Sequence, residues 1–226
     1  MKYRFELLLA VVFAVIFGLF CQWQDPGHKL TPAELDGYLA KIEAGAQMPA
    51  AEKASLLAHL RAWGEADDGG PVYMYNLMRY HDAVRQPPGL PVVGETPEEV
   101  NAYYEEKAMA VMLSSGSYPV LSNLPQGVRS AAFDSTNLID YREALDHWDR
   151  LLVVRYTSRR AFLELISDPR YLKVMPYKFA AVEVALVPTS AEVLIPDLRF
   201  VLGSILLTLF LLVGWVRSAR GGRSSP

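Results

Sequence analysis

The chain has 226 residues, of which 51% are hydrophobic, and its formal net charge is -3. This length is sufficient for one domain of ordinary size with additional segments. A mildly acidic chain without a basic patch among aromatic residues excludes nucleic acid as an expected partner. The single cysteine, Cys21, excludes an internal disulfide, and the sequence has no CxxC or Cys/His cluster that would hold a structural zinc.

Two uncharged apolar segments lie near the ends of the chain, at 7–20 and 200–216. A helix needs roughly 17–25 apolar residues to cross a bilayer, so we expect a transmembrane anchor at 5–22 and a transmembrane helix at 199–216. Basic residues precede the first segment and follow the second. By the positive-inside rule both termini are then cytoplasmic, and the central domain faces outward from the cytoplasmic membrane if the source is a bacterium.

The first apolar segment has two other interpretations, a cleaved secretory signal and a lipoprotein signal ending at Cys21. No A-x-A-like cleavage site follows the segment, and Glu6 does not suit a cleaved signal. The bulky Phe20 next to Cys21 does not suit lipid modification. These features favour an uncleaved signal anchor and leave the other two interpretations open.

Two helices are predicted after the first apolar segment, over 31–45 and about 50–63. The first begins with Thr31, Pro32 and Glu34, which is the pattern of a capping box with proline at the first helical position. The second carries leucines on one face and ends at Gly64. Together they predict a helical hairpin over 31–64.

The segment from 71 to 188 has a different character. Alternating apolar residues and β-branched residues predict strands at 71–80, 117–124, 149–156 and 181–188. Another capping box predicts a helix over 96–116, a helix starts at Thr157 or Ser158 and runs to about Ile166, and Asp168-Pro169 starts a short helical piece. The expected fold class is therefore α+β: a ferredoxin-like βαββαβ antiparallel sheet with its helices on one face.

Three stretches in this segment carry a resemblance to known proteins: YNLMRY at 75–80, the pair Tyr103 and Tyr104, and WDRLLVVRYTSRRAFLELISDPRYLKVMPYKFAAVE at 148–183. They resemble the dimeric α+β barrel superfamily, and most of all the group of domains of unknown function related to EthD and NIPSNAP-type domains. The resemblance covers about half the chain and leaves out the hairpin and the membrane segments. It implies that two protomers close their open sheet faces into a barrel, so we expect a homodimer.

The strand at 149–156 is apolar on both faces of the predicted sheet: Leu151 and Val153 lie on one face, and Leu152, Val154 and Tyr156 lie on the other. A strand that is apolar on both faces is normally covered on both faces. The cover can be a second copy of the chain. It can also be the hairpin at 31–64, which would argue against the dimer.

Proteins of this superfamily include cofactor-free monooxygenases, haem-degrading enzymes and isomerases, with their site residues inside the barrel. The ligand-binding candidates here are Asn76, Arg79, Tyr104 and Arg155. Asn76 shares an apolar strand face with Met74 and Met78, and a buried polar side chain needs a partner or a ligand. One hypothesis places Asn76, His81 and Arg155 around a pocket for a small aromatic or acidic molecule, with His81 as a base.

Structural interpretations compete with these roles. His81 at a strand end is expected to be solvated, and Tyr103 and Tyr104 have the spacing of packing residues. Asp146, His147 and Asp149 are too close in sequence to converge readily on a metal, so we expect no metal and no other cofactor.

The expected function is therefore binding of a small organic ligand or a partner protein by the outward-facing domain, with a scaffold for the membrane helices also open. The alternative is a cofactor-free enzyme, monooxygenase-like or isomerase-like, which predicts that His81 or Asp149 points into the pocket.

Overall fold

The structure is a computed structural model, and it describes residues 4–127, 135–138, 142, 144, 146–193, 196 and 198–221. It divides into two compact units, Met1–Ser190 and Ala191–Pro226, which are described separately below.

The centre of the first unit is a four-stranded antiparallel sheet. Its strands are β1 (Val72–Tyr80), β2 (Tyr118–Asn123), β3 (Arg150–Tyr156) and β4 (Val182–Thr189), in the order β2-β3-β1-β4. Every strand end lies within one residue of its predicted position. The α+β class and the antiparallel sheet predicted from the sequence are therefore confirmed.

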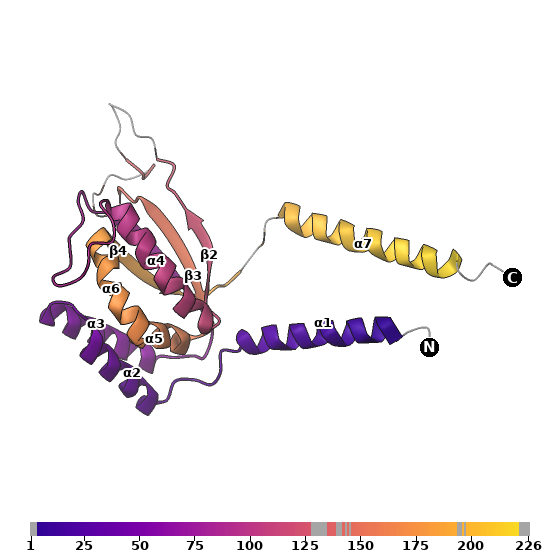
Figure 1. The fold of residues 1–226 in the computed structure, drawn as a ribbon, viewed down its shortest axis with the longest axis horizontal. Coiled ribbons are helices and arrows are strands. Elements are labelled where there is room, and N and C mark those ends of the chain that lie inside the picture. Colours follow the sequence, from indigo (N-terminus) through magenta and orange to yellow (C-terminus); the bar gives the residue numbers. More distant parts are fainter. Residues whose placement is uncertain are drawn as a thin grey trace. The chain divides into compact units, whose positions relative to one another are not determined.

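Three helices lie on one face of this sheet: α4 (Pro97–Ser114), α5 (Arg159–Ser167) and α6 (Pro169–Ala181) (Figure 1). The sheet side chains beneath them alternate with those of the other face, so Met74, Asn76 and Met78 are all buried. Helix α6 is longer than the short piece predicted, because it continues through Pro176 to Ala181.

The predicted hairpin consists of α2 (Pro32–Gly45) and α3 (Ala50–Glu65). The capping box at its start is present: Thr31 Oγ1 accepts a bond from the Glu34 backbone N–H, and the Glu34 carboxylate accepts one from Thr31 N–H. Helix α2 packs against α5 and α6. The hairpin therefore lies on the helical side of the sheet, and it does not cover the open face.

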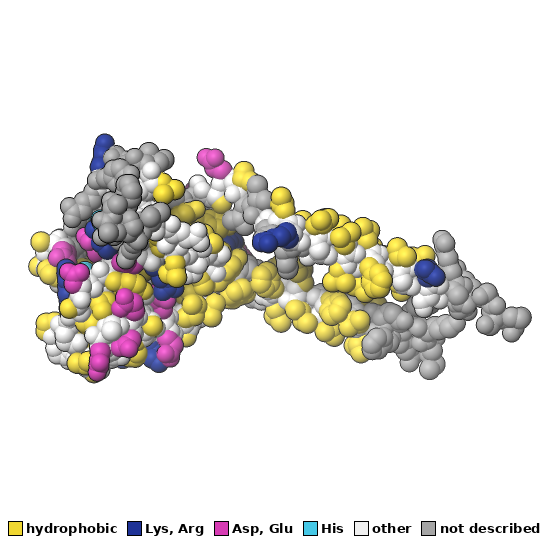
Figure 2. Space-filling view, turned by 90° about the horizontal axis from the view of Figure 1, so that it is seen from above, with side chains coloured by type: hydrophobic (Ala, Val, Ile, Leu, Met, Phe, Trp, Pro, Cys, Tyr) yellow, Lys and Arg dark blue, Asp and Glu magenta, His cyan; other side chains and the backbone are white. Residues whose placement is uncertain are grey.

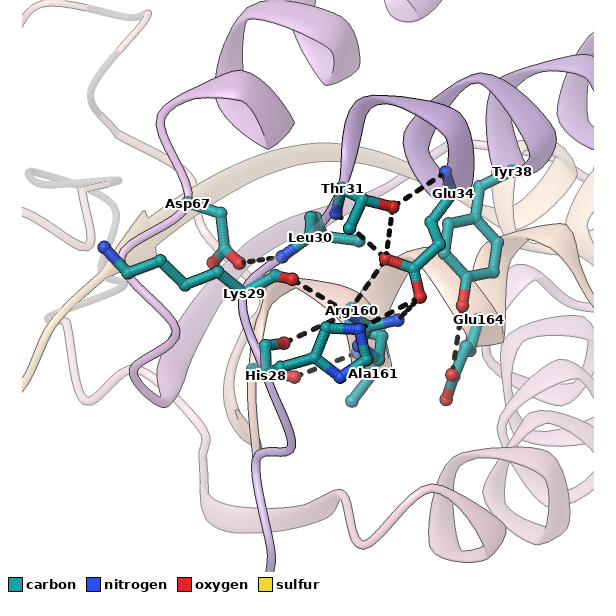
Figure 3. A network of polar contacts seen from close by, with 11 residues as sticks. His28, Lys29, Leu30, Thr31, Glu34, Tyr38, Asp67, Arg160, Ala161 and Glu164 are labelled. Carbon is teal, nitrogen blue, oxygen red and sulfur yellow. Dashed lines mark hydrogen bonds and ion pairs between the residues drawn. The ribbon is translucent and has the colours of Figure 1, made fainter.

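A network of charged and polar groups fastens the hairpin to α5 (Figure 3). Arg160 of α5 donates to the Glu34 carboxylate and to the backbone oxygens of His28 and Lys29. The hydrogen bond from Arg160 lowers the pKa of Glu34 below its usual range, so the carboxylate stays charged in the folded protein at mildly acidic pH.

The open face of the sheet carries exposed apolar side chains from three strands. Tyr75, Leu121 and Val187 are 42%, 48% and 44% exposed. Tyr75 and Val187 are directly opposite each other in the β1–β4 ladder. No described element of the first unit covers these three side chains.

Two apolar helices flank the domain in sequence, α1 (Arg4–Trp23) and α7 (Leu198–Gly221). Their visible surfaces are mainly hydrophobic, whereas charged side chains lie over the globular part (Figure 2). Within the described residues, Val201–Ala219 of α7 is the one helical stretch with the length and composition to cross a membrane, and the apolar part of α1, Leu7–Trp23, is shorter. The prediction of two spans is thus supported for one helix.

The end of α1 is attached to the sheet domain. Trp23 Nε1 donates to Leu113 O at 2.8 Å, and its ring stacks on Tyr118 with centroids 6.1 Å apart. Gln24 donates to Gly116 O at 2.9 Å. The last turn of this helix is therefore part of the first unit.

Candidate functional site

A cavity of about 470 Å³ lies between the sheet and the helices that cover it. Side chains of all four strands, of α4, α5 and α6, and of the hairpin line it. Its volume falls in the range of about 300–1,000 Å³ that is usual for small-molecule sites. The lining includes exposed side chains, among them Phe179 at 42% and Leu186 at 41%, so the cavity reaches the surface.

The lining is predominantly apolar and rich in methionine. Five of the seven methionines of the chain contribute to it: Met74, Met78, Met109, Met112 and Met175. Aromatic side chains line it as well, among them Trp63, Tyr156 and Phe162. Methionine side chains are flexible and polarisable, so this surface can adapt to ligands of different shape.

The main polar group in the cavity is the ammonium of Lys178, on α6. Lys178 is 7% exposed, and its Nζ donates to Asn76 Oδ1 at 2.9 Å. The orientation of Asn76 is fixed, because its Nδ2 donates to the backbone oxygens of Met74 and Leu152. Burial lowers the pKa of Lys178 to about 8.

An ion pair lies beside this lysine. Arg150 NH1 is 2.8 Å from both carboxylate oxygens of Glu105, and both residues line the cavity. Asn101 also donates to Glu105, at 3.0 Å. The Glu105 carboxylate is therefore already occupied by partners from its own helix and from β3.

Two tyrosines complete the polar part of the wall. The hydroxyls of Tyr104 and Tyr171 are 2.9 Å apart, and both side chains are buried. Burial raises the pKa of each phenol, so both remain neutral at physiological pH. The Tyr104 ring lies under the Lys178 ammonium, 5.5 Å from its centroid, and this contact stabilises the cation.

Of the residues proposed from the sequence, Asn76 and Tyr104 line the cavity. The partner that Asn76 was expected to need is Lys178. Arg79 and Arg155 lie at odd-numbered positions of β1 and β3, and the strand alternation places them on the opposite face from Asn76. The hypothesis that Asn76 and Arg155 share a pocket is therefore wrong.

The two arginines of the open face have other contacts. Arg79 donates to Asp146 O at 2.6 Å, lies 3.6 Å from the Glu183 carboxylate and stacks over Trp148. Arg155 donates to Gln24 at 2.5 Å and lies over the Tyr118 ring. Both hold segments of the chain in place.

The two catalytic candidates do not point into the cavity either. A ring nitrogen of His81 lies 3.2 Å from Phe179 O, and the Asp149 carboxylate accepts the Tyr80 N–H at 2.8 Å. Neither belongs to the described lining. Both groups lie at the end of β1. There Asp149 binds the backbone of Tyr80, and His81 contacts the backbone of Phe179 in α6.

The Asp146 side chain has a structural role. Its carboxylate accepts bonds from Ser135, from Thr136 and from the backbone N–H of His147. The bond from Ser135 is the main cause of its lowered pKa. Over the described ranges of the chain, no group of three His, Cys, Asp or Glu side chains has the geometry to hold a metal ion.

Sequence reasoning missed Lys178, Glu105 and Arg150. One signal for Lys178 was available: it follows Tyr171, Val174 and Met175 at helical spacing, on the apolar face of α6. A lysine on an apolar helix face is either buried or a ligand contact.

No protein-family model and no curated protein matches the chain. Two solved structures are similar, each at 26% identity. The first is the crystal structure of the methylated RPA0582 protein, with a TM-score of 0.49, covering 68% of this chain and 98% of that one. The second is described as a protein of unknown function from Rhodopseudomonas palustris and a structural genomics target, with a TM-score of 0.48, covering 67% and 99%. Neither description states an activity.

Proposed function

We propose that this protein is a membrane-anchored binding module whose α+β domain takes a small organic molecule into the cavity between its sheet and its helices. The observation that carries the proposal is the cavity itself, an apolar space of about 470 Å³ with a few polar groups at one wall. Buried polar groups converging on an apolar space are the usual arrangement of a small-molecule site.

The test uses the full-length protein in lipid nanodiscs and the neutral probe 2-naphthamide, with binding measured by calorimetry against empty nanodiscs. We expect saturable binding to the wild type. Ala108→Leu puts a larger side chain into the cavity wall and should weaken binding, whereas Ala102→Leu on the exposed face of α4 should not. Absence of binding, or equal binding by both variants, would contradict the proposal.

The cofactor-free enzyme remains the alternative from a different class. It requires a base in the cavity, but His81 and Asp149 lie elsewhere. His59 belongs to the lining, but it is an exposed residue of α3 whose Nδ1 lies 2.7 Å from Ser55 O. The described carboxylate at the wall is Glu105, which Arg150 holds in an ion pair. These positions favour binding over catalysis, and no observation supports a particular reaction.

We also propose that the domain is a ferredoxin-like protomer of the dimeric α+β barrel type, related to the EthD and NIPSNAP-type domains, and that a second copy covers its open face. The strand order β2-β3-β1-β4 and the helices on one face agree with such a protomer. The exposed Tyr75, Leu121 and Val187 provide an apolar surface for the partner.

For the membrane we propose two spans, α1 and α7, with both termini cytoplasmic and the domain outside. Basic residues precede the first apolar segment and follow the second, so they lie on the side of the chain termini and support this orientation. In a chain with Cys21→Ser, a cysteine at the exposed Val92 should react with an impermeant maleimide in intact cells, and one at position 225 only after permeabilisation. The reverse pattern would overturn the orientation.

A further inference from the structure

We propose that the cavity ligand is an aromatic carboxylate, with its carboxylate at the Lys178 ammonium and its ring among the methionines. This inference rests on the proposed function, because it names the chemical class of the molecule that the cavity binds. Three features of the wall lead to it: an uncompensated charge, a neighbouring acid that is already paired, and an apolar surface suited to a flat ring.

The uncompensated charge belongs to Lys178. An ammonium has three N–H donors, and the one hydrogen bond that Lys178 makes to a described residue goes to the amide oxygen of Asn76. Among the described residues, no carboxylate lies within 4.0 Å of its Nζ. A buried cation without a counterion is costly, so an anion that arrives with a ligand would offset a penalty already present in the fold.

Glu105 does not serve as that counterion. Both of its oxygens lie 2.8 Å from Arg150 NH1, and Asn101 occupies one of them as well. The wall holds two cationic groups, Lys178 and Arg150, and one anionic group, Glu105. The local formal charge is therefore +1, and a monoanionic ligand makes the wall neutral.

The surroundings of Lys178 also indicate the chemistry of the apolar part of the ligand. Asn76 is locked by its own hydrogen bonds to the backbone, so the ammonium is held at a fixed place on the wall. Five methionine side chains line the same cavity, and thioether sulfur makes favourable contacts with aromatic rings. A flat ring bearing one carboxylate matches both the charge and the lining.

The experiment compares two probes of nearly equal shape, 2-naphthoate and neutral 2-naphthamide, by calorimetry on the full-length protein in nanodiscs at pH 7. We expect the wild type to bind naphthoate about tenfold or more tightly than naphthamide, because a charge-assisted hydrogen bond is gained. Lys178→Gln should remove this preference while naphthamide still binds. Lys173→Gln makes the same charge change at an exposed position of α6 and should keep it.

The outcomes separate the two proposals. Equal affinity of the wild type for both probes overturns the aromatic-carboxylate inference and leaves the binding function standing. A preference for naphthoate that survives Lys178→Gln overturns the role of Lys178. Absence of binding by either probe overturns the binding function, and the inference with it. If Lys178→Gln does not fold, Lys178→Met, which removes the same charge, takes its place in the comparison with Lys173→Gln.

Discussion

At the scale of single residues, Lys178 links the stability of the fold to pH. Burial lowers its pKa from 10.5 to about 8, against a smaller opposing effect of Glu105. Between these two values the unfolded chain binds more protons than the folded one. Stability therefore rises with pH across this window as far as Lys178 is concerned, by on the order of 3 kcal/mol in total.

Lys178→Met should remove this contribution. We expect the difference in unfolding midpoint between wild type and variant to change from pH 7.5 to pH 10, with the wild type gaining relative to Lys178→Met. The groups around the ammonium, Asn76, Tyr104, Glu105 and Arg150, are common to both proteins. The measurement is thermal unfolding of the full chain in detergent, with Lys173→Met as control. A pH-independent difference would show that Lys178 is not buried in solution.

The same residue shows why the site was only partly predictable. Asn76 and Tyr104 were found because a polar residue on an apolar strand and an aromatic residue on a helix stand out in a linear pattern. Lys178 was missed because the helix that starts at Asp168-Pro169 was predicted to be a short piece, and a lysine outside a recognised helix is normally taken as solvated. Arg155 was wrongly grouped with Asn76, because the pairing of β1 with β3, which the sequence does not show, fixes which positions share a face.

At the scale of elements, Gly116 controls the attachment of α1 to the sheet domain. It has a φ of +73°, and a Cβ at this position would lie 2.2 Å from Trp23 O. A side chain there meets a backbone atom that cannot move without detaching Trp23 from Leu113 and Tyr118. Glycine at this turn is therefore required by both the backbone conformation and the close approach.

Gly116→Ala should destabilise the domain more than Gly89→Ala. Gly89 also has a positive φ, of +74°, but a Cβ at Gly89 would meet no atom within 4 Å, so its substitution costs only the backbone term of about 1–2 kcal/mol. Gly116→Ala adds the clash with Trp23. Chemical unfolding monitored by tryptophan fluorescence measures both, and equal losses would mean that the end of α1 is not held against the domain.

Elements with local signals were predicted closely. The capping boxes at Thr31 and Thr96 located the starts of α2 and α4, because side chain and backbone satisfy each other within four residues. The position of the hairpin was not predictable in this way. It depends on contacts between residues more than a hundred positions apart, such as Arg160 with Glu34.

At the scale of the whole molecule, the two faces of the sheet have different proposed functions: one lines the ligand cavity, and the other forms the dimer interface. The cavity lies on the helical side, lined by Met74, Asn76 and Met78, and the exposed Tyr75 and Val187 lie on the other side. Strand alternation alone produces this division. A second copy can therefore cover the open face without filling the cavity on the helical side.

The dimer is tested by placing a charge on the open face. Val187→Glu introduces a carboxylate opposite Tyr75, and at an apolar interface this charge would be buried without a partner. We expect the full chain in detergent to have the mass of a dimer by light scattering, Val187→Glu to have that of a monomer, and Val92→Glu, on an exposed loop, to remain dimeric. Because the cavity lies on the opposite side, the monomeric variant should still bind 2-naphthamide. A monomeric wild type would instead mean that the open face meets a different partner, while loss of binding in Val187→Glu would mean that the second copy contributes to the cavity.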